Sequence, residues 1–234
     1  GNPENQEIMG EFAECLEGVK EACNFLNYPV VSGNVSFYNG TNKKNIYPTP
    51  VIGGVGLIKK LSKPLSHNFK QADSTIILIG KTFGHIEQSC YLKENYSITD
   101  GMPPEINLLN EKNNGENLLK LIDKNLILSA HDISNGGLIT ALSEMSLTSD
   151  FGAKIYKPKK LTNLFKYFFG EDQARYIIEI QTQKLPIVEK ILKESNIYYE
   201  NIGLTQENYF EIEGELKIST KDLFKINNQW YSNY

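Results

Sequence analysis

The sequence of 234 residues contains only three cysteines, which excludes two common kinds of site. Cys15, Cys23 and Cys90 are odd in number and form no Cys-x-x-Cys pair, so they predict neither a disulfide framework nor a zinc site. Cysteines used in this way are typical of a reducing cytoplasm. Cys15 and Cys23 fall on the apolar face of the first predicted helix, where we expect buried thiols.

Long apolar runs and basic stripes are also missing. No apolar run approaches the length that a membrane-spanning helix needs, and the first ten residues lack the charged and apolar regions of a signal peptide. The net charge is -4, with lysines scattered among acids, which is unlike a nucleic-acid-binding surface. A composition of 40% hydrophobic and 22% charged residues is ordinary for a soluble globular protein. We expect a cytoplasmic protein that binds neither nucleic acid nor membrane.

Helical and strand patterns interleave without the strict repeat of a barrel or a Rossmann sheet, which predicts an α+β fold. The first helix is predicted to begin behind Asn2 and to end at Asn27–Pro29. Its apolar residues recur at steps of three and four, which predicts a core-facing stripe: Ile8, Phe12, Cys15, Leu16, Val19, Cys23 and Leu26. Further helices are predicted at residues 118–123, 138–147 and 186–194, and residues 91–115 are predicted to be mostly loop.

Strands are predicted where apolar and β-branched residues form short runs: residues 30–31, 50–59, 74–80, 126–130, 176–180, 198–204 and 209–212. The strand at residues 50–59 contains Gly53, Gly54 and Gly56, which indicates that another group packs closely on its backbone. The pattern of residues along the sequence changes near Leu61-Ser62-Lys63-Pro64. We therefore expect a domain boundary there, between residues 1–64 and 65–234.

Gly33-Asn34-Val35-Ser36, directly after the predicted strand at Val30-Val31, is the first candidate site. A glycine lets a backbone approach a phosphate, an asparagine oxygen can bind Mg²⁺, and a serine hydroxyl can hold an anionic oxygen. The alternative is a strand that ends in a turn, with Asn34 and Ser36 bonded to nearby backbone groups. On spacing alone the alternative is the commoner case.

A second candidate is the stretch AHDISNGGL at residues 130–138, where a strand enters and two glycines lead into a helix. Free amides at the start of a helix can bind an anion; alternatively, a side chain at Ser134 or Asn135 only caps the helix. His131 and Asp132 could pair to fix the turn. However, neighbouring residues of a strand point to opposite faces, so we do not expect that pair to act together.

The third candidate is the stretch FGEDQAR at residues 169–175, which places acid and amide side chains just before a predicted strand. It could present a carboxylate and an amide to a ligand, although such clusters are more often solvated turns. The sequence contains no phosphate-binding GxxxxGK[ST] loop, no HExxH pair and no serine or cysteine in a nucleophile elbow. The residues by themselves therefore predict an α+β protein with a plausible phosphate-and-metal loop.

Four longer stretches closely resemble the large synthetase subunit of phosphoribosylformylglycinamidine synthase: GNPENQEIMGEFAECLEGVKEAC, YPVVSGNVSFYN, IYPTPVIGGVGLI and SAHDISNGGLITALSEM. GEDQARYIIEI and the tail ISTKDLFKINNQWYSNY fit the same family. The resemblance implies the two-domain architecture of aminoimidazole ribonucleotide synthetase. Residues 1–64 would be the end of a truncated first domain and residues 65–234 the second domain, both from the second half of the subunit.

The family uses ATP to activate the amide oxygen of formylglycinamide ribonucleotide, which ammonia then replaces during purine biosynthesis. The resemblance therefore implies a ligase with ATP and Mg²⁺, supplied with ammonia by a glutaminase subunit and joined by a small bridging subunit. It also implies that Gly33 contacts ATP, Asn34 binds Mg²⁺ and Ser36 contacts the substrate. No residue matches the upstream catalytic histidines, so we assign no catalytic residue and expect the chain alone to be inactive.

This sequence departs from the family pattern at two positions. Asn135 stands where the family commonly has aspartate, and Glu171-Asp172-Gln173 stands where a Glu-Ser-Gln triplet binds substrate in the first half. Both changes suit a structural domain, so we leave both segments out of the site. The alternatives are another ATP-dependent synthetase of the same superfamily, against which the loop YNGTNKKNIYPTP argues, and a non-catalytic interaction module.

Overall fold

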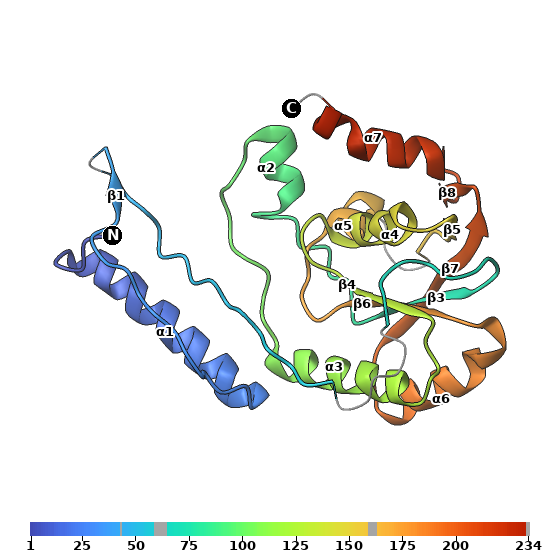
Figure 1. Ribbon diagram of the computed structural model, residues 1–234, viewed down its shortest axis with the longest axis horizontal. Helices are drawn as coiled ribbons and strands as arrows, with labels where there is room; N and C mark the ends of the chain where they lie inside the picture. The colour runs from blue at the N-terminus through green and yellow to red at the C-terminus, as the bar shows by residue number, and fades with distance from the viewer. Residues whose placement is uncertain (43, 59–64, 159–162, 233–234) are drawn as a thin grey trace. The chain divides into compact units, whose positions relative to one another are not determined.

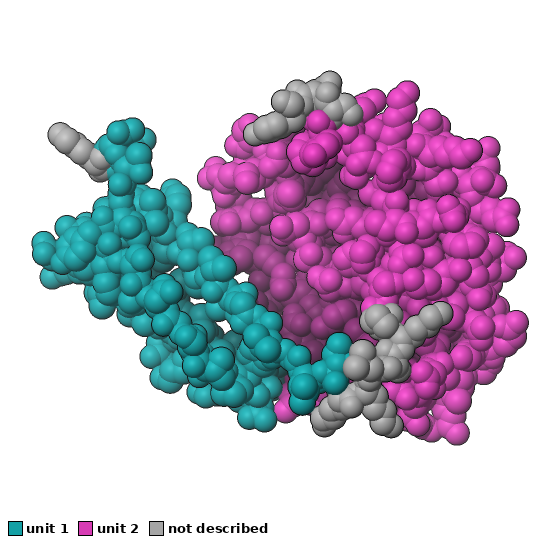
Figure 2. Space-filling model, in the orientation of Figure 1, with its two compact units in different colours: residues 1–62 teal, residues 63–234 magenta. Residues whose placement is uncertain are grey.

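The computed structural model describes residues 1–42, 44–58, 65–158 and 163–232, and the chain divides into two compact units (Figures 1 and 2). Unit 1 comprises residues 1–62 and unit 2 comprises residues 63–234. The predicted boundary at Leu61–Pro64 lies outside the described residues. Among the residues that are described, no helix is long and apolar enough to cross a membrane.

Unit 1 consists of one long helix and an extended chain. Helix α1 spans Gln6–Leu26, and the side chain of Asn5 caps it by accepting a 2.9 Å hydrogen bond from the backbone N–H of Glu7. The predicted cap, Asn2, is wrong: a turn closed by the bond from the Asn5 N–H to the Asn2 carbonyl comes first, so the helix begins one turn later. Asn27 ends the helix in the left-handed conformation, with a φ of 53°.

No described residue of unit 1 is buried. The predicted stripe on α1 is only partly confirmed: Ile8, Phe12, Cys15, Val19 and Cys23 are half-buried, whereas Leu16 and Leu26 are exposed. The two thiols are thus less buried than we expected. One side of the helix meets the extended chain, where the rings of Phe12 and Phe37 lie 5.4 Å apart, edge to face. In the space-filling view, open gaps remain between the helix and that chain (Figure 2).

Two predicted strands of unit 1 are wrong. Residues 30–31 and the described part of the second prediction, residues 50–58, have no strand partner; residue 59 lies outside the described part. A strand requires a neighbour for its backbone N–H and C=O groups, and no described segment provides one. The only ladder within the described part of unit 1 is a small antiparallel hairpin of β1 (Gly40–Thr41) and β2 (Lys44–Asn45).

Unit 2 is built on a mixed sheet with the strand order β4-β6-β3-β7-β5-β8-β9 (Figure 1). All of its pairs are antiparallel except β5 with β8. Its strands are β3 (Thr75–Ile79), β4 (Ser129–Asp132), β5 (Phe151–Ile155), β6 (Tyr176–Ile180), β7 (Tyr199–Glu207), β8 (Tyr209–Ile212) and β9 (Leu216–Ser219). Its helices are α2 (Cys90–Tyr96), α3 (Leu108–Asp123), α4 (Gly137–Leu147), α5 (Leu164–Phe169), α6 (Leu185–Glu194) and α7 (Thr220–Ser232), with a short 3₁₀ turn at Thr182–Lys184.

Helices cover both faces of this sheet, which confirms the α+β class. On one face, α4 and α5 pack on alternate residues of the central strand, including Ile76 and Leu78. On the other face, α3 and α6 pack on Ile77 and Ile79. Figure 1 shows these two helical layers above and below the sheet. Because it is covered on both faces, β3 is buried at every position and apolar from Ile76 to Ile79, as the apolar run in the sequence predicts.

Most predicted elements of unit 2 are confirmed, with shifted ends. β6 and β8 have the predicted bounds, whereas β4 begins three residues later than predicted. The predicted loop at residues 91–115 is wrong, because α2 and the first half of α3 lie there. Their many asparagines disguise the helical period: Asn107 caps α3, and Asn114 donates a 2.8 Å hydrogen bond to the carbonyl of Ala174.

A buried arginine ties together the loops beyond β3 and before β6. The guanidinium of Arg175 donates to the carbonyls of Asp172 (3.0 Å) and Gly170 (2.6 Å), and to the hydroxyl of Thr82 (3.2 Å). The carboxylate of Asp172 in turn accepts bonds of 2.9–3.1 Å from three successive backbone amides, residues 83–85. Burial lowers the pKa of Arg175, and the negative charge of Asp172 opposes that shift.

A second buried carboxylate, Glu179 on β6, holds the chain that enters unit 2. It accepts hydrogen bonds from the backbone amides of Lys70 (2.9 Å) and Gln71 (3.3 Å) and from the hydroxyl of Ser129 (2.8 Å). Burial raises the pKa of Glu179, against the opposing effect of these hydrogen bonds.

We expect Asp172→Ala to destabilise unit 2 by about 3–5 kcal/mol, because it leaves the buried Arg175 charge without its counter-ion and three amides without their acceptor. Urea unfolding followed by circular dichroism measures this loss. Asp150→Ala removes an exposed carboxylate as a control and should cost less than about 0.5 kcal/mol. Similar losses in both variants would contradict the role given to Asp172.

Glu179 should make unit 2 more stable at low pH. Its raised pKa means that the folded state binds the proton more tightly than the unfolded chain, whose ordinary pKa is 4.5. This contribution is complete below pH 4.5 and is lost as the pH rises through the folded pKa. The free energy of unfolding of the wild type, relative to that of Glu179→Gln, should therefore fall as the pH rises above 4.5. Glu116→Gln, at an exposed position, is the control variant. A wild-type advantage that grows with pH would be incompatible with this account.

Candidate functional site

The first candidate, Gly33-Asn34-Val35-Ser36, lies on the exposed extended chain of unit 1. The alternative reading needs the Asn34 and Ser36 side chains to bond nearby backbone groups. Within the described part of the chain neither side chain makes a hydrogen bond; only the Ser36 carbonyl accepts one, at 3.2 Å from the Asn39 side chain. Both polar side chains are therefore available to another molecule or another segment.

Crowding within the described part of unit 1 does not explain why residue 33 is a glycine. A Cβ placed on it would meet no atom of the described structure within 4 Å, and its φ lies outside the left-handed region that favours glycine. Gly152 in unit 2 shows the contrast, because a Cβ there would lie 1.9 Å from the carbonyl oxygen of Tyr209. The open space above Gly33 fits the close approach of a ligand to its backbone.

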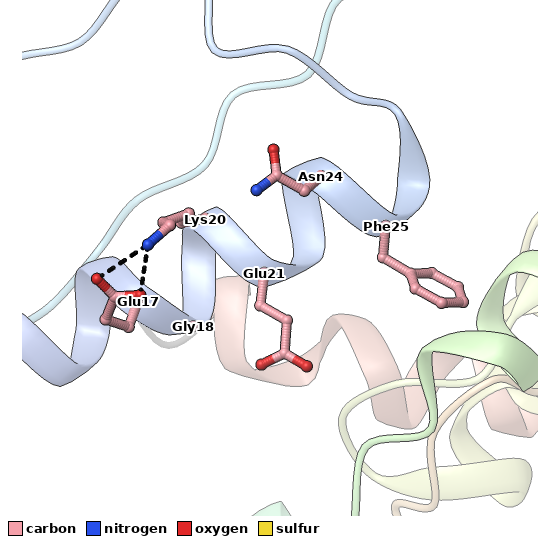
Figure 3. Close-up of a pocket in the computed structure, with 6 residues that line it drawn as sticks. All are labelled: Glu17, Gly18, Lys20, Glu21, Asn24 and Phe25. Carbon is pink, nitrogen blue, oxygen red and sulfur yellow. Dashed lines mark hydrogen bonds and ion pairs between the residues drawn. The ribbon is translucent and has the colours of Figure 1, made fainter.

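A hollow of about 610 Å³ also lies in unit 1, beside α1 (Figure 3). Its lining comes from one helix alone: Glu17, Gly18, Lys20, Glu21, Asn24 and Phe25. The Lys20 ammonium lies 2.9 Å from the Glu17 carboxylate, and both side chains are exposed. This ion pair joins two exposed side chains of the same helix, so it does not indicate a catalytic site in the hollow.

In unit 2, the second candidate stretch contains an interaction that we did not expect. His131 Nδ1 lies 3.3 Å from Asp132 Oδ1, and His131 Nε2 lies 3.1 Å from Glu144 Oε2. The expectation that His131 and Asp132 do not meet is therefore wrong. Asp132 is the last residue of β4 and is largely exposed, so no further strand holds its side chain to the opposite face. Glu144 comes from α4, and no sequence signal connected it with His131.

The surroundings of His131 form a shallow hollow of about 310 Å³, lined by His67, Leu118, Ala130, His131, Asp132 and Tyr176. The rings of His67 and His131 lie 5.2 Å apart, and His67 Nε2 is 3.3 Å from the Thr148 hydroxyl. Burial raises the pKa of Tyr176, and the charges of Glu111 and Asp132 add to that effect. In the described ranges, no three His, Cys, Asp or Glu side chains are arranged to hold a metal ion.

The glycine turn before α4 is filled by the protein itself. The Glu171 carboxylate accepts 2.7 Å hydrogen bonds from the amides of Gly136 and Cys90, so the Gly136 amide is not open to an anion. The alternative of a side-chain cap from Ser134 or Asn135 is not found either, because Gly136 is the capping residue and no side chain bonds there. Gly137 is required by contact: a Cβ on it would lie 2.6 Å from the Gly170 carbonyl oxygen.

Within the third candidate, residues 169–175, the segment Glu171-Asp172-Gln173 is therefore not a solvated turn over most of its length. Asp172 is buried and Glu171 is half-buried, and both carboxylates point at backbone amides of other loops. Only Gln173 is exposed. Arg175, two residues on and directly before the apolar strand of residues 176–180, is the sequence signal that could have revealed a buried charge network.

Two family models match the chain. The model described as "AIR synthase related protein, C-terminal domain" matches residues 71–213, and the corresponding N-terminal domain model matches residues 1–58. Among curated proteins, the phosphoribosylformylglycinamidine synthase subunit PurL of Pelagibacter ubique is 50% identical over all 234 residues, and that of Rhodopseudomonas palustris is 40% identical. The chain covers 32% of each, so it spans about a third of the length of these relatives.

Solved structures agree at the level of the fold. Thermotoga maritima PurL complexed with FGAR has a TM-score of 0.59 at 15% identity, over 68% of this chain and 29% of that one. The same protein complexed with ATP has a TM-score of 0.53 at 14% identity, over 68% and 27% of the two chains. The C-terminal domain model alone covers more than half of the present sequence. The chain therefore belongs to the AIR synthase related protein family.

Proposed function

We propose that this chain is part of an ATP-dependent ligase, the synthetase subunit of phosphoribosylformylglycinamidine synthase. In this proposal the intact protein converts formylglycinamide ribonucleotide and ammonia to formylglycinamidine ribonucleotide in the cytoplasm. A glutaminase subunit would supply the ammonia, and a small bridging subunit would join the two. The main support is the 50% identity to a PurL subunit along the whole chain. Residues 1–64 and 65–234 would be the end of an N-terminal domain and a C-terminal domain.

The residues of the first candidate site have the chemistry that this function needs. Asn34 offers a carbonyl oxygen without a protein partner among the described residues, and such oxygens suit Mg²⁺. Gly33 leaves its backbone open to a phosphate of ATP, and the Ser36 hydroxyl can bind a polar substrate atom. If the segment becomes a strand in the intact protein, Asn34 and Ser36 point to one face, because they are two residues apart.

One asparagine oxygen is not a complete Mg²⁺ site. This ion takes six ligands and keeps several waters or phosphate oxygens, so further ligands must come from outside the described residues. When bound, ATP supplies the phosphoryl group that activates the amide oxygen of the substrate. The role of this chain is to place the Asn34 oxygen, the Gly33 backbone and the Ser36 hydroxyl; we assign it no proton transfer.

A non-catalytic module is the second candidate. The supporting observation comes from unit 2, where the Glu171 and Asp172 carboxylates accept hydrogen bonds from backbone amides and do not face a ligand. The two proposals are compatible if unit 2 acts as a structural domain within a larger enzyme. The two proposals differ in one prediction: only the ligase proposal expects substitutions of Asn34 and Ser36 to lower turnover.

Asn34→Ala and Ser36→Ala should each lower kcat/KM of the intact subunit by about tenfold or more, the factor for one lost contact of 1.4 kcal/mol. The free energy of unfolding should change by less than about 0.5 kcal/mol, because both side chains are exposed and unbonded. Higher Mg²⁺ concentration should partly rescue Asn34→Ala but not Ser36→Ala. Asn24→Ala on α1, an exposed asparagine outside the site, is the control. Parallel losses of activity and stability would favour a structural role.

The chain alone should be inactive and should bind Mg²⁺–ATP weakly. Charge-assisted hydrogen bonds contribute about 1.5–3 kcal/mol each. The loss of three such bonds to missing segments would weaken binding by roughly a thousandfold or more, at 1.4 kcal/mol per tenfold. Isothermal titration calorimetry measures this. Micromolar affinity would show that the chain carries a complete nucleotide site and would contradict the proposed division of the site.

A further inference from the structure

The sequence contains three asparagines that are directly followed by glycine: Asn39-Gly40, Asn114-Gly115 and Asn135-Gly136. In such a pair the backbone nitrogen of the glycine can attack the side-chain carbonyl carbon of the asparagine, because glycine has no side chain to hinder the approach. The reaction needs a glycine N–H that can lose its proton and an asparagine side chain that can turn towards it. Hydrogen bonds to these two groups therefore decide which pair reacts.

The pair Asn135-Gly136, in the turn before α4, is held in an unreactive state. The Gly136 N–H donates a 2.7 Å hydrogen bond to the Glu171 carboxylate. Loss of the proton from this nitrogen would place two negative charges side by side, and like charges at hydrogen-bond distance repel strongly. Glu171 therefore protects Asn135 from this reaction.

The pair Asn114-Gly115 is protected by its position inside α3. The Asn114 side chain is buried and donates a 2.8 Å hydrogen bond to the Ala174 carbonyl, which keeps it turned away from the next residue. Gly115 lies in the middle of the helix, where each N–H is bonded to the carbonyl four residues earlier. Both reacting groups of this pair are therefore engaged.

The pair Asn39-Gly40, at the start of the small hairpin, differs in both respects. The Ile46 N–H donates to the Asn39 carbonyl at 3.3 Å, so residues 39 and 46 form a hydrogen-bonded pair. Bonded and non-bonded pairs alternate along an antiparallel ladder, which leaves the Gly40 N–H, opposite Asn45, without an acceptor on β2. Gly40 is exposed, and within the described residues only a 3.2 Å bond to the Ser36 carbonyl holds the Asn39 side chain.

We propose that Asn39 is a site of spontaneous deamidation in the folded chain. The Gly40 nitrogen loses its proton and bonds to Cγ of Asn39, and the side-chain nitrogen leaves as ammonia, which gives a cyclic succinimide. Water then opens the ring at one of its two carbonyl groups and yields aspartate or isoaspartate. The reaction consumes only water and needs no oxidant or cofactor. This inference does not depend on the proposed function.

Deamidation would change the hairpin in two ways. Either product replaces the amide that donates to the Ser36 carbonyl with a carboxylate, which can only accept. Isoaspartate also adds a methylene group to the backbone beside β1, which disturbs its register with β2. The segment that carries Ser36 thereby loses its hydrogen bond to the residue that precedes the hairpin.

Peptide mapping by mass spectrometry tests the proposal on the chain, incubated in mildly alkaline buffer with and without urea until Asn39 has converted in urea. In the folded chain we expect aspartate and isoaspartate at Asn39, each adding one negative charge to the net charge of -4, while Asn114 and Asn135 stay intact. In urea the protecting bonds are lost, so all three should convert. Asn42, exposed in the same hairpin but not followed by glycine, is the internal control and should stay intact.

Two further measurements check the mechanism. Asn39→Gln keeps a side-chain amide but requires a larger ring, so it should abolish the added charge without changing the circular dichroism spectrum. Amide hydrogen exchange followed by nuclear magnetic resonance should be fast at Gly40 and slow at Gly115 and Gly136.

Conversion of Asn114 or Asn135 before Asn39 in the folded chain would overturn the proposal. So would an Asn39 that stays intact in the folded chain after it has converted in urea, or a protected Gly40 amide. Aspartate without isoaspartate at Asn39 would also contradict it, because direct hydrolysis of the side chain passes through no succinimide.

Discussion

The interaction on which unit 2 depends most is the enclosure of Arg175 and Asp172. Both groups are removed from water. The Arg175 guanidinium donates to two carbonyls and a hydroxyl, and the Asp172 carboxylate accepts from three backbone amides of the loop that follows β3. A buried charge is tolerated only when its partners are complete. The loops after β3 and before β6 are consequently fixed relative to the sheet, and Glu171 extends the same bonding to the starts of α2 and α4.

This bonding accounts for the contrast between the two candidate sites. In unit 2, the acidic residues that could have faced a ligand are occupied by the backbone of the same domain. In unit 1, Asn34 and Ser36 lie on a chain that has no partner of its own within the described residues. The exposed polar side chains of the first candidate site therefore lie in unit 1, on the extended chain.

The sequence allowed the elements of unit 2 to be predicted where one physical signal dominated. The apolar run of β3 and the amphipathic period of α4 and α6 were sufficient, because each signal lies within the element itself. The strands at residues 30–31 and 50–58 were wrong for the opposite reason: an apolar β-branched run makes a strand only when a neighbour supplies hydrogen bonds. Helix α2 and the start of α3 were missed because asparagines and short turns hide their period.

The candidate site was predictable in its chemistry but not in its contacts. Glycine, amide and hydroxyl in one short segment pointed to a polar ligand, and the resemblance to a family supplied the roles. The pairing of His131 with Glu144, and of Glu171 with Gly136, joins residues 13 and 35 positions apart. Local periodicity contains no information about such pairs, since they depend on how the helices pack on the sheet.

The position of β3 in the sheet also affects how the protein folds during synthesis. β3 pairs with β6 and β7, so that Ile77 faces Ile178 on one side and Asn201 on the other. Chains emerge from the ribosome amino end first, at about 5–20 residues per second. The most apolar strand of unit 2 therefore remains unpaired for several seconds, until both later strands have been made. Contacts between residues so distant in sequence also place unit 2 among the slower-folding topologies. During that interval the apolar run of β3 is the segment that most needs protection by a chaperone.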